Sequence, residues 1–361
     1  MPKIRVLIVD DSVVIRRLLT EILSAEQDFE VVGGAANASL ALAKIEQSTP
    51  DIVILDVEMP EMSGLDLLTE IAKRGHKLRV IMFSSLTQRA AATTLEALAR
   101  GAADYVTKPS GTGSREASVD LVRSQLVPKI RALAPSSYDR RTTGSNRMSV
   151  APGERAFKGA PFGVVAVGSS TGGPNALAEL FRLVPATFEL PIVIVQHMPP
   201  LFTRLLAERL TESCPLQFRE ASAGDVLEPG RAFIAPGDHH LRVVREGARV
   251  KLALDQGPQE NSCRPAVDVL FRSIADVFAE KTLAIVLTGM GQDGLRGAEL
   301  IRARGGRILV QDEASSVVWG MPGFIARAGL ADAALPLPEL AAELIRHGQR
   351  IRASEDQLRA C

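Results

Sequence analysis

The chain has 361 residues, which is enough for two domains of ordinary size joined by a linker. Hydrophobic residues make up 46% of the sequence and the formal net charge is zero, so the composition fits globular domains and gives no overall attraction to nucleic acid. No apolar run approaches the ~20 residues that cross a bilayer, and the N-terminus lacks the apolar core of a signal peptide, so we expect a cytoplasmic protein without direct membrane insertion.

The cysteines are Cys214, Cys263 and Cys361, and their spacing is not that of metal ligands. Their odd number and the expected cytoplasmic location favour reduced thiols. We therefore expect no metal site that is built on cysteine.

The N-terminal third alternates short apolar runs with amphipathic stretches in which apolar residues recur at helical spacing. Five such units over residues 1–121 predict an α/β domain with a doubly wound, five-stranded parallel sheet of the flavodoxin type. The predicted strands are residues 4–10, 29–35, 51–56, 79–84 and 104–108.

The segment at residues 122–160 is predicted to hold the end of a helix over 119–133 and then an interdomain linker. From residue 135 onward it is rich in Ser, Thr, Gly, Pro and Arg, which cannot bury enough apolar surface to form a core. Its excess of basic residues favours a solvated spacer, with attraction to an acidic surface as the alternative.

Apolar runs resume after the linker and predict a second doubly wound, mostly parallel α/β domain over residues 161–352, followed by a tail at 353–361. Short alternating runs between residues 232 and 254 predict a β-hairpin in or beside its sheet. The predicted strands are 163–168, 191–196, 283–288 and 307–311, and the predicted helices include 176–183, 201–210 and 295–303.

Polar residues follow the strands of the first predicted sheet, where ligands of such folds bind. Asp10 and Asp11 follow the first strand, Asp56 the third, Ser84 the fourth and Lys108 the fifth. Any one of these acids would suit a helix cap, but together they predict an Mg²⁺ site formed by Asp10, Asp11 and Asp56. Asp56 is then a nucleophile toward a phosphoryl group, with Lys108 and Ser84 as its partners.

These residues give residues 1–120 a resemblance to the response-regulator receiver family, with LDVEMPEMSG around Asp56 and TKP at Lys108. The resemblance implies that a chemotaxis histidine kinase phosphorylates Asp56 and that Ser84 and Tyr105 are switch residues. It also implies that Lys108 is the invariant lysine of the family and that the peptide bond between Lys108 and Pro109 is cis.

The sequence GSSTGG lies between an apolar strand and a predicted helix and contains G-x-S-x-G with Ser170 at its centre. This is the setting of a nucleophile elbow, in which a sharp turn exposes the serine hydroxyl. A Gly-rich turn of this kind also suits phosphate binding, and Ser169 is a second hydroxyl beside it. Gly172 and Gly173 are expected to leave room for the substrate.

His197 ends the next predicted strand, and Asp293 follows a later one in LTGMGQDG. Taken singly, a structural histidine and a helix-capping aspartate are reasonable interpretations. Because the carboxyl ends of parallel strands share one edge, we expect Ser170, His197 and Asp293 to meet there as a catalytic triad.

The chain order Ser, His, Asp differs from the Ser, Asp, His order of α/β-hydrolases. With this order, the second half of the chain resembles the chemotaxis protein-glutamate methylesterase family of the CheB type. The resemblance is also carried by the motifs VQHMP, FIAPGDHH, CRPAVDVLF and EASSVVWGMP. The resemblance implies that Ser170 is the nucleophile, that Met290 contributes an oxyanion N–H, and that Thr171 supports the histidine. The family usually has Ala where this chain has Ser169.

The same resemblance implies a serine carboxylesterase that hydrolyses glutamate γ-methyl esters on the cytoplasmic helices of methyl-accepting chemoreceptors, with glutamine deamidation as a second activity. The receiver would use Mg²⁺ and the esterase no cofactor. We expect a monomer in which phosphorylation of the receiver relieves inhibition of the esterase cleft.

Three other interpretations are weighed against this one. A DNA-binding output would need a compact basic helix-turn-helix, which the near-neutral second half does not offer. A nucleotide-binding adaptor would need a P-loop or a dinucleotide motif, and GSSTGG has neither the Lys-Ser/Thr ending of the first nor the G-x-G-x-x-G spacing of the second. The same esterase acting on methylated proteins of another pathway remains open.

Overall fold

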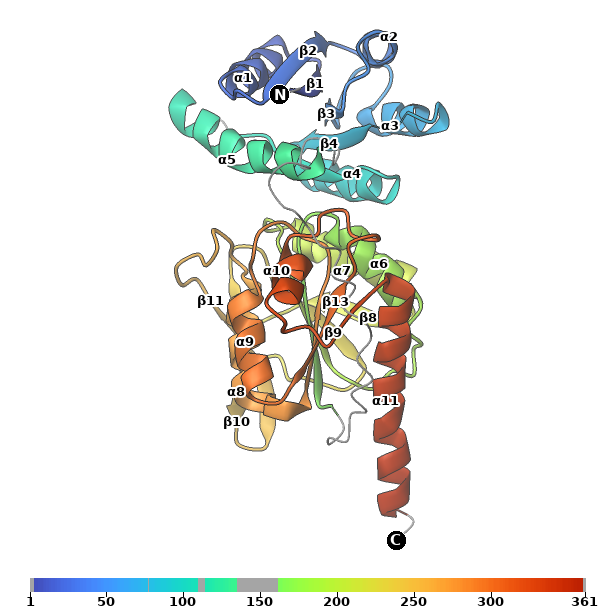
Figure 1. The fold of residues 1–361 in the computed structure, drawn as a ribbon, viewed down its shortest axis with the longest axis vertical. Helices are drawn as coiled ribbons and strands as arrows, with labels where there is room; N and C mark the ends of the chain where they lie inside the picture. The colour runs from blue at the N-terminus through green and yellow to red at the C-terminus, as the bar shows by residue number, and fades with distance from the viewer. Residues whose placement is uncertain (1–2, 77, 110–113, 135–161, 360–361) are drawn as a thin grey trace. The chain divides into compact units, whose positions relative to one another are not determined.

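The structure is a computed structural model that describes residues 3–76, 78–109, 114–134 and 162–359. The chain divides into two compact units, Met1–Met148 and Ser149–Cys361. The predicted linker at 135–160 lies outside the described residues, and the predicted domain limits at 121, 160 and 352 remain a proposal. The helix α11 (Leu337–Arg359) leads to the C-terminus, so residues 353–359, expected as a tail, are helical (Figure 1).

The first unit contains a five-stranded sheet in the order β2-β1-β3-β4-β5, and all neighbouring strands are parallel. This order confirms the predicted flavodoxin-type sheet. Apart from the edge strand β2, its side chains are almost all buried, which explains why these strands appear in the sequence as continuous apolar runs. The strands are β1 (Ile4–Val9), β2 (Phe29–Ala35), β3 (Ile52–Asp56), β4 (Arg79–Ser84) and β5 (Asp104–Thr107).

Four helices connect these strands and a fifth follows β5, and each begins at a polar residue whose side chain accepts a backbone N–H of the first turn. One of these caps, Ser114, starts the last helix at Arg115, which is earlier than the predicted residue 119. The helices are α1 (Val13–Ser24), α2 (Ala38–Ser48), α3 (Gly64–Lys73), α4 (Gln88–Ala99) and α5 (Arg115–Leu133).

The second unit contains a seven-stranded sheet in the order β14-β13-β12-β6-β7-β9-β8, again with all neighbours parallel. The chain order reverses between β6 and β12, and this switch point is where doubly wound sheets bind ligands. The strands are β6 (Val164–Ser169), β7 (Ile192–Gln196), β8 (Gln217–Glu220), β9 (Arg231–Ile234), β12 (Thr282–Val286), β13 (Arg307–Gln311) and β14 (Ala333–Leu335).

Helices cover both sides of this sheet (Figure 1). One group contains α6 (Gly173–Arg182), α7 (Phe202–Ser213) and α11, and the other contains α8 (Val267–Phe278), α9 (Leu295–Ala303) and α10 (Met321–Arg327). A short 3₁₀ helix, η1 (Ala279–Lys281), follows α8. Among the helices of the described part of the chain, none is long and apolar enough to span a membrane.

A separate antiparallel hairpin consists of β10 (His240–Glu246) and β11 (Arg249–Asp255). It packs on α8, where the backbone N–H of Val243 donates to Ser273 Oγ at 3.0 Å. The hairpin itself is confirmed, but its predicted start at residue 232 is wrong. The first part of that stretch is β9, whose buried residues pair in parallel with β7 and β8 in the main sheet.

Candidate active site and phosphoacceptor site

The three residues predicted to form a triad lie at the ends of three adjacent central strands. Ser170 follows β6, His197 follows β7, and Asp293 lies in the loop between β12 and α9. Because β7, β6 and β12 are neighbours in a parallel sheet, their carboxyl ends lie at the same edge. The structure therefore places all three residues at the switch point of the second unit.

The turn that carries Ser170 connects β6 directly to α6. The Ser170 N–H donates to Thr288 O at 3.1 Å, and the Gly173 N–H donates to Ser170 O at 2.8 Å. Gly289 lies against this turn, and a Cβ atom at that position would come within 3.0 Å of Ser170 Cβ and 2.4 Å of Met321 Sδ. Ser170 is partly exposed at the start of α6, as a nucleophile elbow requires.

Ser169, the other hydroxyl of the motif, has a structural role. It is fully buried, and its Oγ donates to Gln196 Oε1 at 2.7 Å. Gln196 Nε2 in turn donates to Ser170 O at 3.0 Å. The space left by the missing side chain of Gly173 holds the Gln196 amide, since a Cβ there would lie 1.9 Å from Oε1. The expectation that Gly173 leaves room for substrate is therefore wrong.

Asp293 is buried and both of its carboxylate oxygens accept hydrogen bonds. Oδ2 accepts the Val267 N–H at 2.6 Å, and Oδ1 accepts the Asp268 and Gly294 N–H groups at 3.0 Å each. The first two donors are the orphan N–H groups that begin α8, whose N-cap residue Ala266 has no capping side chain. Asp293 therefore caps α8 as well as facing His197.

His197 presents its two ring nitrogens to different partners. Nε2 lies 2.8 Å from Asp293 Oδ2, and Nδ1 lies 3.5 Å from Cys263 Sγ. Burial favours the neutral ring, but the charge of Cys263 and the hydrogen bonds with Asp293 and Cys263 outweigh it and raise the pKa of His197 to about 10. Burial alone would raise the pKa of Asp293, whereas the bonds from His197 and from the start of α8 lower it.

Within the described residues, Ser170 Oγ makes no hydrogen bond to His197. Hydrogen bonds between nucleophile and base are often long in ligand-free enzymes and shorten when substrate binds. Asp293 therefore orients the His197 ring at the same edge of the sheet at which the partly exposed Ser170 lies.

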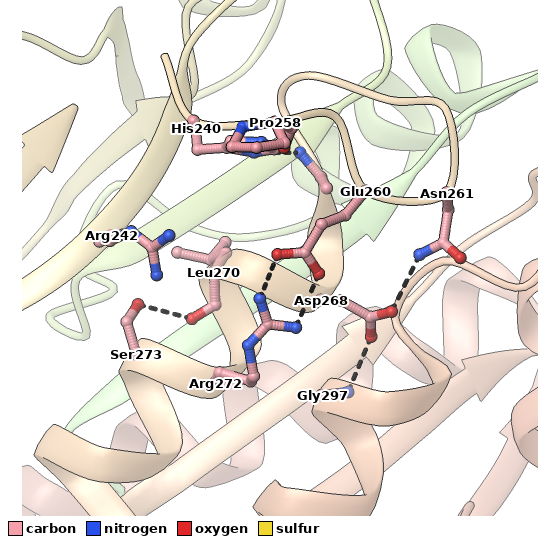
Figure 2. A network of polar contacts seen from close by, with 12 residues as sticks. His240, Arg242, Pro258, Glu260, Asn261, Asp268, Leu270, Arg272, Ser273 and Gly297 are labelled. Carbon is pink, nitrogen blue, oxygen red and sulfur yellow. Dashed lines mark hydrogen bonds and ion pairs between the residues drawn. The ribbon is translucent and has the colours of Figure 1, made fainter. Parts of the chain in front are cut away.

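A second layer of polar contacts joins Asn261, Asp268 and Gly297 (Figure 2), and Asn261 connects it to Asp293. Asn261 Nδ2 donates to Asp293 Oδ1 at 2.9 Å and to Asp268 Oδ2 at 3.0 Å, and Asp268 Oδ1 accepts the Gly297 N–H at 2.7 Å. Burial is the main cause that raises the pKa of Asp268, and the Asp293 charge adds to it. Neither Asn261 nor the contact of Cys263 with His197 could be predicted from the sequence; the available signal was the CRPAVDVLF motif, which begins at Cys263, two residues after Asn261.

Met290 and Thr171 lie in the two loops beside Ser170. Among the described residues, the Met290 N–H has no hydrogen-bond acceptor, which leaves it available to an oxyanion. The carbonyl of Thr171 accepts a hydrogen bond from Thr288 Oγ1 at 2.9 Å, which ties the elbow to the end of β12. The predicted support of His197 by Thr171 stays a prediction.

The first unit brings its predicted acidic residues together at the ends of β1 and β3. One oxygen from each of Asp10, Asp11 and Asp56 lies within 4.8 Å of the other two. Lys108 Nζ lies 2.8 Å from Asp56 Oδ1 and 2.9 Å from Asp10 Oδ2. Burial and the Asp10 charge raise the pKa of Asp56 to about 6, although Lys108 acts in the opposite direction.

This cluster fits a magnesium ion by the chemistry of its donors. Asp10 Oδ2 is buried, and its charge faces the Lys108 ammonium at 2.9 Å. Carboxylate oxygens gathered in this way are ready ligands for a hard cation, and Mg²⁺ prefers oxygen ligands.

Ser84 and Tyr105 are buried in the first unit. Thr94 Oγ1 donates to Ser84 Oγ at 2.7 Å, so the Ser84 hydroxyl faces α4. Lys129 Nζ donates to the Tyr105 carbonyl at 2.7 Å. The expected cis bond before Pro109 is wrong: the cis peptide bond of the described residues precedes Pro265, and a trans bond is the lower-energy form for an X–Pro pair.

Comparisons with known proteins agree with this organisation. The CheB methylesterase family model matches residues 165–344, and the response regulator receiver domain model matches residues 6–119. A protein-glutamate methylesterase/protein-glutamine glutaminase of Trichodesmium erythraeum (strain IMS101) is 52% identical over 354 residues, which cover 96% of this chain and 99% of the relative. One of Nocardioides sp. (strain ATCC BAA-499 / JS614) is 49% identical and covers 98% of each chain.

The second unit is also similar to a solved structure, the catalytic domain of the Thermotoga maritima CheB methylesterase. That crystal structure is 41% identical, with a TM-score of 0.51, and the match covers 52% of this chain and 99% of the other. With relatives this similar over nearly its whole length, the chain belongs to the CheB methylesterase family and carries a response-regulator receiver domain at its N-terminus.

Proposed function

We propose that Ser170, His197 and Asp293 form the catalytic triad with which this protein-glutamate methylesterase hydrolyses glutamate γ-methyl esters of chemoreceptors. The observation that carries the proposal is the 2.8 Å contact between His197 Nε2 and Asp293 Oδ2 at the strand edge that also presents Ser170. Both carboxylate oxygens of Asp293 accept hydrogen bonds, so the side chain is held in its ionised form. This carboxylate orients the His197 ring and stabilises the imidazolium.

In the proposed reaction, His197 takes the proton of Ser170 through Nδ1 as the serine oxygen attacks the ester carbonyl. The Met290 N–H and the N-terminal end of α6 stabilise the oxyanion. Methanol leaves with the proton that His197 returns, and water then hydrolyses the acyl-enzyme by the same route. With a glutamine side chain as substrate, ammonia leaves in place of methanol, which gives the glutaminase activity.

We propose that phosphorylation of Asp56 by a chemotaxis histidine kinase raises this activity. Asp10, Asp11 and Asp56 would hold Mg²⁺, which neutralises phosphoryl charge when bound. Lys108 holds the Asp56 carboxylate in place, and Ser84 is the hydroxyl that turns toward the new phosphoryl group. The substrate helices belong to the cytoplasmic part of the receptors, so we place the enzyme in the cytoplasm. We further propose that it acts as a monomer.

The test is methanol release from methylated chemoreceptor membranes, with and without a small-molecule phosphodonor and Mg²⁺. We expect stimulated release with the wild type, none with Ser170→Ala, and unstimulated release with Asp56→Ala. Equal release from wild type and Ser170→Ala would contradict the triad. Stimulation that persists in Asp56→Ala would contradict the assigned phosphoacceptor.

A further inference from the structure

One tight turn, residues 260–263 between β11 and α8, contacts two members of the triad. Asn261 Nδ2 donates to Asp293 Oδ1 at 2.9 Å, and Cys263 Sγ lies 3.5 Å from His197 Nδ1. The triad residues themselves come from three strand ends, so this turn is a separate element that reaches them from the side of α8. The turn contacts the acid Asp293 through Asn261 and the base His197 through Cys263.

We propose that Cys263 is a positioning residue of the esterase, which holds the His197 imidazole at Nδ1 and stabilises its protonated form. The inference rests on the proposed function, because it requires His197 to be the base that serves Ser170.

The two nitrogens of His197 have separate tasks in this arrangement. Asp293 is an acceptor at both oxygens, so Nε2 carries the hydrogen that lies between the two residues. The proton of the serine must therefore be taken by Nδ1, and this is the nitrogen that Cys263 contacts. The charge of Cys263 at this nitrogen favours the imidazolium over the neutral ring.

The thiol is fixed in this position by the conformation of the turn. Asn261 and Ser262 have φ values of 51° and 61°, a left-handed pair that is unusual for residues with side chains. The Cys263 N–H closes the turn on Glu260 O at 2.8 Å. Glu260 forms a two-pronged ion pair with Arg272 of α8 (Figure 2).

The far end of the turn is held as firmly. Arg264 donates to Asp238 Oδ1 from Nε at 3.0 Å and from Nη2 at 2.6 Å, and to the Gly257 carbonyl at 2.9 Å. Cys263 lies between these anchors, so its backbone is held beside the imidazole and its Sγ is within reach of Nδ1.

The charged groups that act on His197 come from three elements. Cys263 belongs to the turn and Asp293 to the β12–α9 loop, while Asp268 and Arg272 of α8 act on Asp293 from behind. Replacing Cys263 leaves the other three in place. A change in the pH dependence of the reaction would therefore report the thiol itself.

The experiment is the pH profile of kcat/KM for methanol release by the full-length, phosphodonor-activated enzyme, with the release by Ser170→Ala subtracted. The variants are Cys263→Ala, Cys263→Ser and, as a matched control, Cys214→Ala. Cys214 is a buried thiol whose nearest partners are Ser213 and the Ala178 carbonyl, on the α6–α7 side of the sheet.

We expect the acid limb of the profile to move to lower pH by about one unit in Cys263→Ala, because a group that favours imidazolium is gone. Cys263→Ser should keep a higher kcat than Cys263→Ala, since its hydroxyl can still contact Nδ1. The acid limb of its profile should lie at the same lower pH as in Cys263→Ala, because a hydroxyl holds no charge in this range. Cys214→Ala should match the wild type. An acid limb that stays in place or moves upward in Cys263→Ala would overturn the proposal.

The contact between Cys263 and His197 can also be measured without esterase activity, by alkylation of the thiol. The rate at which iodoacetamide alkylates Cys263 is followed against pH by mass spectrometry, in the wild type and in His197→Gln. A paired thiol should react at lower pH in the wild type than in the variant, with Cys214 unchanged in both. Identical profiles would overturn the pairing, whereas a fully active Ser170→Ala enzyme would instead overturn the proposed triad.

Discussion

Asp293 Oδ2 lies 2.8 Å from Nε2 of His197, while the same carboxylate accepts the two backbone N–H groups that begin α8. In the sequence, helix capping and catalysis were alternative interpretations of this aspartate. In the structure one side chain does both, since α8 has no capping side chain of its own. The stability of the second unit and the orientation of its base therefore depend on the same group.

Asp293→Asn should lose esterase activity and also destabilise the protein. Both oxygens of Asp293 accept N–H groups, so an amide NH₂ meets a donor in either orientation. We expect a loss of roughly 1–3 kcal/mol in the free energy of unfolding, measured with urea. Asp276→Asn is the control, because Asp276 makes an exposed ion pair with Arg304. Equal stability of the two variants would contradict the capping role.

The two serines of the motif should separate in a labelling experiment. Ser169→Ala leaves the buried Gln196 Oε1 without its donor, so it should lose about 1 kcal/mol of stability and still react with a fluorophosphonate probe. Ser170→Ala should keep its stability and lose the label. Peptide mass spectrometry identifies the labelled serine, and a label on Ser169 in the wild type would reverse the assignment.

Thr94→Val should make the receiver easier to activate. The Ser84 hydroxyl must leave Thr94 to reach a phosphoryl group on Asp56, and the variant removes that hydrogen bond. One bond of about 1 kcal/mol corresponds to a roughly fivefold lower phosphodonor concentration at half-maximal methanol release.

Thr93→Val is the matched control for this change. Thr93 Oγ1 donates to the Arg89 carbonyl of its own helix, on the exposed side of α4 and away from Ser84. A shift of the same size in both variants, or a higher requirement in Thr94→Val, would contradict the role given to Ser84.

The sequence predicts most of the sheet and the triad because both depend on the ends of apolar strands. Asp56, Ser170 and His197 could be placed for that reason. The edge strands β8 and β14 were missed because each is short and has one buried residue, so neither shows an apolar run or a period.

The contacts of Asn261 and Cys263 were missed for a different physical reason. Sequence signals for a turn with two left-handed residues rely on glycine, and residues 260–263 contain none. The turn is held by Arg272 and Asp268 of α8, which are tertiary contacts that no local pattern encodes. The role of Gln196 likewise depends on the gap at Gly173, which only the packing of β7 against α6 reveals.

The raised pKa of His197 predicts how the stability of the protein depends on pH. Its folded-state value of about 10 exceeds the ~6.5 of an unfolded histidine, so between these values the folded state binds the additional proton. The stabilisation is complete below about pH 6.5 and is lost as the pH rises through about 10. His197→Gln lacks this proton, so its deficit relative to the wild type should be largest at pH 6.5 and should shrink toward pH 10. Urea unfolding of both proteins at these pH values measures the deficit. A deficit that is constant with pH would mean that His197 has an ordinary pKa, and that neither Asp293 nor Cys263 stabilises its protonated form.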